Sequence, residues 1–300
     1  MRIGVTGGTG FIGQYLLKEY SSQHEFVVIT SLEDTSSLYH FKEQIEYVCA
    51  PYTYEGFTNA FRTCQGVIHL GAKRSSSENE KSIGNYFENI TVSEALFCAC
   101  ADLKIRNVVN ISSTAVYDTT VQYPFAESCP AAPLSNYGIV KHAIENIAHL
   151  LNRKYDMNIK SLRIAQVLGY GERKGYMLSI FLENCLLKKA LNVYGSGKAG
   201  REYIYVKDAA HAIMCALEKE DSAGVFNIGT GILTSNLELA ETFCDVFDNP
   251  SGIEFVDCPE VLEKYVMDVS KADRELGFKS QFSVRKALLD IKKMIIEENA

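Results

Sequence analysis

The sequence lacks the features that direct a chain to a membrane, an oxidising compartment or a metal. No apolar run approaches the roughly 20 residues that a membrane-spanning helix needs. The first expected strand begins at residue 2, which leaves no room for a signal peptide. Nine cysteines are scattered without any C-x-x-C pair, a pattern typical of free thiols and not of disulfides or zinc sites. We therefore expect a cytoplasmic protein with no membrane partner and no bound metal.

Basic residues are also fewer than acidic ones. The 30 Lys and Arg residues are outnumbered by 37 Asp and Glu residues, which gives a formal net charge of −7. A chain of this charge is not expected to bind nucleic acid, and an anionic ligand would need a local group of basic side chains. Hydrophobic residues, in contrast, make up 47% of 300 residues, enough to bury a large core.

The first half of the sequence alternates short apolar stretches with helical patterns. Strands are expected at residues 2–5, 26–29, 45–48, 67–70, 108–111 and 159–164, and the clearest helices at 86–101 and 137–155. Buried strands that alternate with helices are typical of parallel sheets with right-handed crossovers. The sequence therefore predicts an α/β fold with a Rossmann-type, doubly wound parallel sheet.

A glycine-rich turn joins the first strand to the first helix. Gly7 allows a tight turn, Gly10 lets the backbone approach a pyrophosphate, and Gly13 lets the helix pack closely on the strand. Phe11 and Ile12 begin the helix, whose free N–H groups and partial positive charge suit phosphates. The spacing is looser than the usual G-x-G-x-x-G, but its place at a strand-to-helix junction predicts a dinucleotide site.

The end of the second strand bears on the choice of cofactor. An acidic residue there holds the ribose of NAD, and a basic one accepts the extra phosphate of NADP. This chain has Thr30 at that place, with Glu33 and Asp34 following slightly late. The residues themselves leave NAD and NADP open, and Thr30 is a candidate contact to the cofactor in either case.

The fourth strand and the next helix add further candidates. The strand ends in Leu70, Gly71 and Ala72, where small residues let a cofactor lie against the backbone. His69 is interpreted as a core histidine whose hydrogen bonds are satisfied. Asn89, early in the following helix, either donates a hydrogen bond near the nicotinamide or fixes a loop.

The candidate catalytic groups follow the fifth strand. That strand ends in Ser112 and Ser113, and ligands of such sheets lie beyond the carboxyl ends of strands. Tyr137 and Lys141 are spaced i, i+4 and so share one helical face, with Ser135 as the expected cap. We expect the Lys141 ammonium to lower the pKa of the Tyr137 phenol, which makes Tyr137 an acid/base, with Ser113 hydrogen-bonding the same substrate oxygen.

The second half of the chain is expected to form a smaller lobe. Strict alternation weakens after residue 169, and helical patterns follow at 177–187, 237–247 and 284–296. We predict a dinucleotide-binding Rossmann domain over 1–167 and a substrate-binding lobe over 168–300. Residues of about 201–229 are expected to return to the Rossmann sheet, which interleaves the lobe with the first domain.

These motifs together resemble the NAD-dependent sugar-nucleotide epimerase/dehydratase branch of the extended short-chain dehydrogenase/reductase superfamily. The resemblance runs nearly end to end, through the glycine turn, Ser113, Tyr137-x-x-x-Lys141, Val67–Ala72, Tyr194–Gly197, Arg201–Asp208, Phe226–Gly229 and Asp268–Ala272. It implies that Ser113, Tyr137 and Lys141 form the catalytic triad. It implies contacts to the dinucleotide from Gly7, Gly10, Phe11, Ile12, Gly13, Thr30, Leu70, Gly71, Ala72, Asn89, Ser112, Tyr137 and Lys141. The implied substrate contacts are Arg74, Gln166, Arg201 and Tyr265, with Arg201 at the diphosphate.

The resemblance also separates the reactions within the family. Members that dehydrate the sugar place an Asp-Glu pair directly after the strand-five hydroxyl, whereas this chain has Thr114 and Ala115. The remaining groups suffice to oxidise a carbinol and reduce the ketone again. The resemblance therefore implies a nucleoside-diphosphate-hexose 4-epimerase, UDP-linked, that uses NAD. It also implies a homodimer formed through helices 86–101 and 137–155. A 4-ketohexose reductase that uses NADPH or NADH is the alternative, and a non-catalytic dinucleotide sensor is a third.

Overall fold

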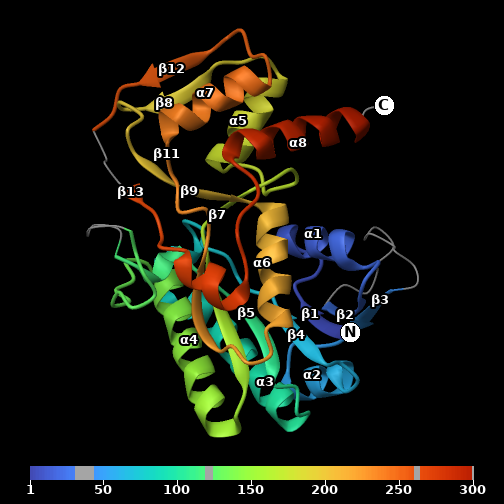
Figure 1. Cartoon of the computed structure of the whole chain (residues 1–300). Coiled ribbons are helices and arrows are strands. Elements are labelled where there is room, and N and C mark those ends of the chain that lie inside the picture. Colours follow the sequence, from blue (N-terminus) through green and yellow to red (C-terminus); the bar gives the residue numbers. More distant parts are fainter. Residues whose placement is uncertain (31–43, 119–123, 260–263, 299–300) are drawn as a thin grey trace.

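The computed structural model describes residues 1–30, 44–118, 124–259 and 264–298. Figure 1 shows two parts, with a helix-flanked sheet below and a smaller group of strands and helices above. All nine cysteines are free thiols. None of the described helices is both long enough and apolar enough to cross a bilayer.

The larger part is built on a seven-stranded sheet in which every pair of neighbours is parallel. Its strands, in spatial order, are β10 (Gly224–Ile228), β6 (Asn158–Ile164), β5 (Asn107–Ser113), β4 (Gly66–His69), β1 (Arg2–Thr6), β2 (Glu25–Thr30) and β3 (Ile45–Cys49). The chain runs outward from β1 to β3 and then crosses to β4 on the other side of β1. The order therefore reverses between β1 and β4, and ligands of such sheets bind at that reversal.

Helices cover both faces of this sheet (Figure 1). On one face lie α1 (Phe11–Tyr20) and α6 (Val206–Glu218), which share one buried cluster with the strands. On the other lie α2 (Tyr54–Phe61), α3 (Phe87–Asp102) and α4 (Asn136–Tyr155), which share a second cluster. Successive strand residues alternate between the two clusters, as Val27 and Val28 do, and both are almost wholly buried. Burial on both faces explains why these strands are continuous apolar runs.

The smaller part holds two further sheets. Strand β9 (Gly200–Tyr205) pairs with β7 (Gln166–Leu168), β11 (Leu233–Ser235) and β13 (Lys264–Tyr265) in a mixed four-stranded sheet. Strands β8 (Leu191–Tyr194) and β12 (Ile253–Val256) form a parallel pair. A third apolar cluster joins them to α5 (Met177–Leu186), α7 (Asn236–Val246) and α8 (Val284–Glu298). Short helices η1 (Asn79–Lys81), η2 (Ile83–Tyr86), η3 (Thr114–Val116) and η4 (Ala272–Leu276) lie between the main elements.

The predicted fold class is confirmed, because a parallel Rossmann-type sheet is interleaved with a smaller lobe. The sheet pairing changes two boundaries of the predicted division into domains. Strand β7 starts at Gln166, before residue 168, and already belongs to the second sheet. Residues 201–205 also belong to that sheet through β9, so the return to the first sheet begins with α6 and is completed by β10. With these adjustments, the two-part division stays our proposal.

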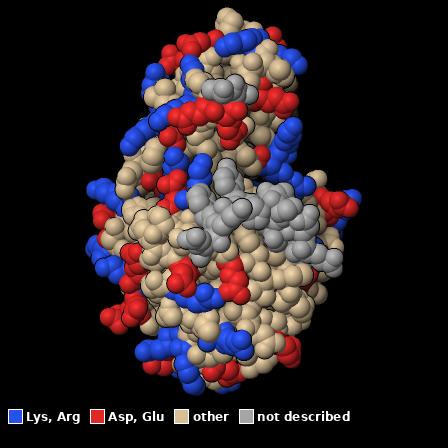
Figure 2. All heavy atoms as spheres, turned by 90° about the vertical axis from the view of Figure 1, so that its right-hand side faces the viewer, with Lys and Arg blue, Asp and Glu red and all other residues tan. Residues whose placement is uncertain are grey.

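Charges on the surface are mixed. In the view of Figure 2, acidic and basic side chains are interspersed, and no broad basic area covers the described residues of that face. This distribution is in keeping with a net charge of −7 and gives no support on that face to a nucleic-acid partner.

Candidate active site

A cleft of about 1000 Å³ lies beyond the carboxyl ends of the parallel strands. Both parts of the chain contribute to its lining, which includes sixteen of the predicted site residues: Gly7, Gly10, Phe11, Ile12, Gly13, Leu70, Gly71, Ala72, Arg74, Ser112, Ser113, Tyr137, Lys141, Gln166, Arg201 and Tyr265. Residues separated by more than 250 positions in the sequence therefore meet in one cavity at the reversal of the strand order.

Two predicted cofactor residues do not line this cleft. Thr30 is buried at the end of β2, and Glu33 and Asp34 lie outside the described residues. The amide of Asn89 is engaged with the backbone of Lys73, accepting from its N–H at 2.7 Å and donating to its C=O at 3.0 Å. These two bonds hold the loop at Lys73, and the contact of Asn89 with the cofactor stays a prediction.

The glycine turn is built as its spacing predicts. Gly7 has a φ of +68°, in the region that favours glycine, and a Cβ there would lie 2.6 Å from the Gly71 nitrogen. A Cβ on Gly13 would lie 2.5 Å from the Gly7 carbonyl oxygen, so only glycine lets α1 approach the turn this closely. Gly10 stands at the N-cap of α1 without a side chain to fill the space in front of the helix. The first N–H groups of α1 have no partner within the helix, and together these features fit a pyrophosphate.

A second close approach brings the catalytic helix to β5. A Cβ on Gly138 would overlap the carbonyl oxygen of Ala115 in η3. Because this glycine follows Tyr137, the first turn of α4 lies directly against the end of the strand that carries Ser113. The Ser135 hydroxyl caps the helix by accepting from the Gly138 N–H at 3.0 Å. The residue after Tyr137 therefore has to be glycine for steric reasons.

Tyr137 does not have the lowered pKa that the sequence led us to expect. Burial raises the pKa of its phenol to about 12, the charge of Arg74 opposes the rise, and Tyr86 adds to it. The ammonium of Lys141 donates to the Ile111 carbonyl at 2.7 Å, and its Nζ lies 5.7 Å from the centre of the Tyr137 ring. In the chain alone, Tyr137 is therefore a protonated phenol at neutral pH.

Lys141 and Ser113 are fixed by their surroundings. Burial lowers the pKa of Lys141 to about 8, against the opposing effect of Glu145. The Ser113 hydroxyl accepts from the Ala115 N–H at 3.2 Å and thereby caps η3. Its proton is not used in that bond, so Ser113 can still donate to a ligand.

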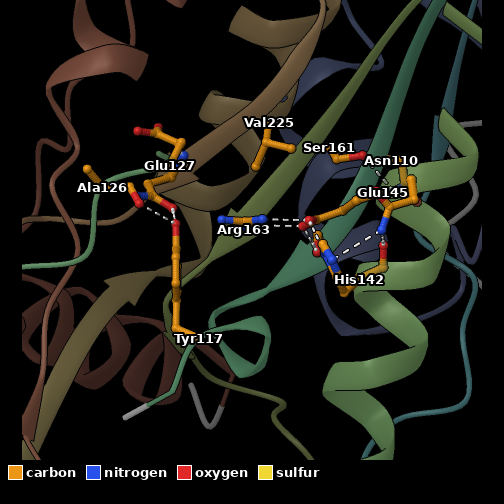
Figure 3. Close-up of polar contacts among 12 residues, drawn as sticks. Asn110, Tyr117, Ala126, Glu127, His142, Glu145, Ser161, Arg163 and Val225 are labelled. Atoms are coloured by element: carbon orange, nitrogen blue, oxygen red, sulfur yellow. Dashed lines mark hydrogen bonds and ion pairs between the residues drawn. The ribbon is translucent and has the colours of Figure 1, made fainter. Parts of the chain in front are cut away.

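A buried ionic network lies behind these groups (Figure 3). Glu145 of α4 accepts two hydrogen bonds from Arg163 of β6, at 2.9 and 2.6 Å. The Ser112 hydroxyl donates to the same carboxylate at 2.5 Å. The Arg163 guanidinium also lies 4.7 Å from the centre of the Tyr117 ring. Glu145 therefore ties the helix that carries Tyr137 and Lys141 to two neighbouring strands.

His69 is a core residue, as interpreted from its strand. Its Nδ1 lies 2.7 Å from the Thr6 hydroxyl and its Nε2 lies 2.9 Å from the Ser93 hydroxyl. Burial lowers the pKa of His69 to about 3, and the charge of Lys141 adds to the effect. The imidazole is therefore neutral and joins β1 to β4 and α3.

The smaller part contributes the basic end of the cleft. The Arg201 guanidinium lies 5.4 Å from the centre of the Tyr265 ring, because β9 and β13 are neighbours with these residues in register. The next residue, Glu202, is buried and accepts from the N–H groups of Gly231 at 2.6 Å and Met267 at 2.8 Å. These bonds hold the strand of Arg201 in place, and Gln166 of the neighbouring β7 lies beside it in the cleft wall.

Arg74 meets groups that the sequence did not single out. Its Nη2 lies 3.8 Å from the carboxylate of Glu172, and its guanidinium lies 5.8 Å from the centre of the Tyr176 ring. Burial raises the pKa of Glu172 to about 7, and the charge of Arg74 opposes the rise. The Tyr176 hydroxyl donates to the Ser75 carbonyl at 3.1 Å, so the two parts of the chain meet here.

Further lining residues were missed from the sequence: Thr9, Ser75, Ser76, Ser77, Glu80, Ser135, Gly175 and Tyr176. The three consecutive serines follow the end of β4 and could have been found from that position alone. Glu80 gave no such signal, because the two backbone N–H groups that it binds on α4 are more than 50 residues away in the sequence.

The fold and the glycine cradle define a dinucleotide-binding protein of the Rossmann class. The sequence matches the NAD dependent epimerase/dehydratase family over residues 3–229, and the chain belongs to that family. The predicted resemblance is thus confirmed, and the family is NAD-dependent.

Solved structures and curated relatives agree with this assignment. The UDP-N-acetylglucosamine 4-epimerase of Bacillus cereus is 30% identical with a TM-score of 0.89, over 99% of this chain and 96% of that one. The UDP-glucose 4-epimerase of Thermotoga maritima, solved with UDP-glucose, is 25% identical with a TM-score of 0.87 over both whole chains. The dTDP-4-dehydro-6-deoxyglucose reductase of Escherichia coli is 26% identical over 92% of this chain and 91% of its own length.

Proposed function

We propose that the chain is an NAD-dependent nucleoside-diphosphate-sugar 4-epimerase that acts on a UDP-hexose. The observation that carries the proposal is the set of side chains that line the cleft beside Tyr137. Ser113, Tyr137 and Lys141 line it together, and Ala115 stands there without any group that could transfer a second proton. Dehydration of the sugar needs an additional acid and base, whereas oxidation and reduction at one carbon need only one proton-transfer group.

The cradle for the cofactor is formed by the turn and by the end of β4. Gly7, Gly10 and Gly13 leave room for a pyrophosphate at the start of α1, and Gly71 and Ala72 form the adjoining wall. Lys141 reaches the same cavity from α4. The chemistry that bound NAD supplies is reversible hydride transfer at C4 of the sugar.

Proton transfer at the C4 oxygen is assigned to Tyr137. Its hydroxyl makes no hydrogen bond to another described residue and is free to meet a substrate oxygen. As a phenol it can donate a proton to a C4 carbonyl, and as a phenolate it can take the proton of a C4 hydroxyl. Ser113 donates a hydrogen bond to the same oxygen. Arg74 is the nearby positive charge that favours the phenolate.

The substrate phosphates are assigned to the basic end of the cleft. Arg201 offers a planar pair of donors suited to phosphate oxygens, and Gln166 offers an amide beside it. Tyr265 and Arg74 complete the walls around the sugar. Non-stereospecific return of the hydride requires that the keto sugar turn over within the cleft.

A reductase of 4-keto sugars is the second candidate. It needs the same three groups, and a dTDP-4-dehydro-6-deoxyglucose reductase is among the relatives of this chain. The two functions differ in how the cofactor is used, because an epimerase regenerates it in every turnover and a reductase consumes it.

The cofactor content of the purified protein and one variant test the proposal. We expect the protein to retain NAD or NADH through purification, and Tyr137→Phe to lower turnover by about 10²–10⁴-fold with cofactor content unchanged. An empty protein that consumes NADPH stoichiometrically would favour the reductase. Full activity in Tyr137→Phe would remove the assigned acid/base.

A further inference from the structure

Glu80 of η1 accepts hydrogen bonds from several segments at once. Its Oε2 accepts from the Asn136 N–H at 2.8 Å. Its Oε1 accepts from the Tyr86 hydroxyl at 2.8 Å and from the Tyr137 N–H at 3.2 Å. Glu80 also lines the cleft, although it belongs to none of the motifs in the sequence. A carboxylate that accepts hydrogen bonds from separate segments on both of its oxygens is fixed in place.

Two of these donors are the first N–H groups of α4. The N–H groups of Asn136 and Tyr137 cannot be satisfied within the helix, and the helix itself has no acidic residue in its first turn. Among the described residues, the Ser135 hydroxyl accepts only from the Gly138 N–H. Glu80 therefore supplies the missing acceptors and the negative charge that stabilises a helix N-terminus. Glu80, which belongs to another element, thus holds Tyr137 through the backbone N–H of that residue.

The third donor, Tyr86, packs against Tyr137. The two ring centres are 5.8 Å apart with planes inclined at 58°, and the Tyr86 side chain is wholly buried. Its proton is directed to Glu80, which, together with burial as the larger cause, raises the pKa of Tyr86. Of the two adjacent phenols, only Tyr137 is left free to exchange a proton in the cleft.

Glu80 also fastens the cleft wall to α4. The Asn136 side chain donates to the Glu80 carbonyl at 2.8 Å, and Asn79 donates to the Arg74 carbonyl at 3.0 Å. The segment from Arg74 to Glu80, which carries the lining serines, is therefore joined to the first turn of the helix. A shift of this segment would move the wall and the phenol relative to each other.

We propose that Glu80 is a positioning residue, whose carboxylate sets the place of Tyr137 relative to the cleft wall. The proposal rests on the proposed function, because it concerns the phenol that carries the proton. Glu80 itself touches no reacting atom in this account. It acts through the backbone of Tyr137 and through the ring of Tyr86.

The neutral isostere provides a strict test, because both backbone partners of Glu80 are donors. In Glu80→Gln, one orientation of the amide places its NH2 group against the Asn136 N–H, and the other places it against the Tyr137 N–H. Neither orientation restores both bonds. Glu80→Asp keeps both acceptors on a shorter side chain and should recover part of the loss. Glu78→Gln is the matched control, because Glu78 is exposed in the same segment and its side chain makes no hydrogen bond to a described residue.

Kinetics of the holoenzyme give the first readout. We expect Glu80→Gln to lower kcat by roughly 10- to 100-fold, the range for a displaced catalytic group, with little change in the KM of the UDP-sugar. Glu78→Gln should keep the wild-type kcat, and Tyr86→Phe should fall between the two because the backbone contacts of Glu80 remain. A wild-type kcat in Glu80→Gln would overturn the proposal, as would equal losses in Glu80→Gln and Glu78→Gln.

A second readout does not depend on activity. In protein labelled with ¹³C in the tyrosine rings, the Tyr137 resonance is identified by its absence in Tyr137→Phe. We expect it to shift or broaden in Glu80→Gln and to stay in place in Glu78→Gln. An unmoved Tyr137 resonance in Glu80→Gln would contradict the positioning role even if no UDP-sugar is turned over. Wild-type protein inactive on every UDP-sugar, with a moved resonance in Glu80→Gln, would refute the proposed function and leave the positioning role standing.

Discussion

The ammonium of Lys141 is bound to the carbonyl oxygen of Ile111 at 2.7 Å, and not to the hydroxyl of Tyr137. Lys141 belongs to α4 and Ile111 to β5, so the bond between them holds the catalytic helix to the strand that ends in Ser113. The same ammonium lines the cleft where the cofactor is proposed to lie. Lys141 thus has a structural role in addition to its proposed contact with the cofactor.

Replacement of Lys141 should therefore affect more than turnover. In Lys141→Ala we expect both a lower kcat and a lower cofactor content, whereas Tyr137→Phe should lower kcat alone. Lys141→Arg keeps the charge but not the compact geometry and should recover cofactor content only in part. Kinetics together with the absorbance of the released nicotinamide measure both effects. Normal cofactor content in Lys141→Ala would contradict the assignment of Lys141 to the cofactor site.

Removal of Arg201 should weaken substrate binding selectively. The loss of a charge-assisted contact to phosphate costs about 1.5–3 kcal/mol, or roughly one to two decades of affinity. We expect Arg201→Ala to raise the KM of the UDP-sugar by that factor and to leave cofactor content unchanged. Lys198→Ala is the control, because this exposed lysine lies close in sequence but outside the cleft lining. An equal loss of cofactor in Arg201→Ala would show that Arg201 is misplaced in our account.

Replacement of only one member of the Glu145–Arg163 ion pair should strongly lower the free energy of unfolding. Both side chains are buried, with exposed fractions of 3% and 4%. Removal of one partner from a buried ion pair costs about 3–5 kcal/mol, because the other charge is left unpaired. We expect losses of this size in the free energy of unfolding for Glu145→Met and for Arg163→Met, and a smaller loss in the double variant than in their sum. Additive losses in urea unfolding would show that the two side chains are not coupled.

The neutral state of His69 predicts a dependence of stability on pH. Burial lowers its folded pKa to about 3, below the ordinary value of 6.5. The unfolded state therefore binds a proton that the folded state refuses, so stability is full above pH 6.5 and falls as the pH drops from 6.5 toward 3. We expect the free energy of unfolding to fall less steeply in His69→Gln than in the wild type between pH 7 and pH 4. The exposed His149 provides the control, and parallel profiles for wild type and His69→Gln would refute the prediction.

The homodimer predicted from the sequence would form through α3 and α4. Large apolar side chains are exposed on these helices, among them Phe87 at 53%, Ile139 at 43% and Leu150 at 61%. We propose that a second copy of the chain covers them, as helix pairs do in four-helix seams. Light scattering at micromolar concentration should give the mass of a dimer, and Leu150→Glu should shift it toward the monomer. A monomer mass for the wild type would end the idea.

Local patterns predicted the fold well, and for physical reasons. Strands covered on both faces are continuous apolar runs, and the helices between them carry the 3.6-residue period. The interleaving was less accessible, because β9 begins with Gly200 and Arg201 and reads like a return to the first sheet. Its actual partners, β7, β11 and β13, are distant in the sequence and too short to give a pattern of their own.

The site was predictable where it follows strand ends and not where it depends on long-range contacts. Ser113, Gly71 and the glycine turn could be placed because they end or follow strands of one sheet. The raised pKa of Tyr137 could not be predicted, because its main cause is the burial of the phenol, about which the i, i+4 spacing says nothing. Glu80 and Glu172 were missed because the α4 backbone that Glu80 binds and the Arg74 that Glu172 meets are both distant in the sequence.

The most direct test of the central claim is an analysis of the sugars. The protein is incubated with UDP-glucose, UDP-galactose and their N-acetylated forms, with and without added NAD, and the products are separated and identified. We predict that at least one pair is interconverted at C4 with no net formation of NADH. Consumption of NADPH or NADH with a 4-keto sugar, and no epimer from any of the four, would contradict the epimerase and favour the reductase.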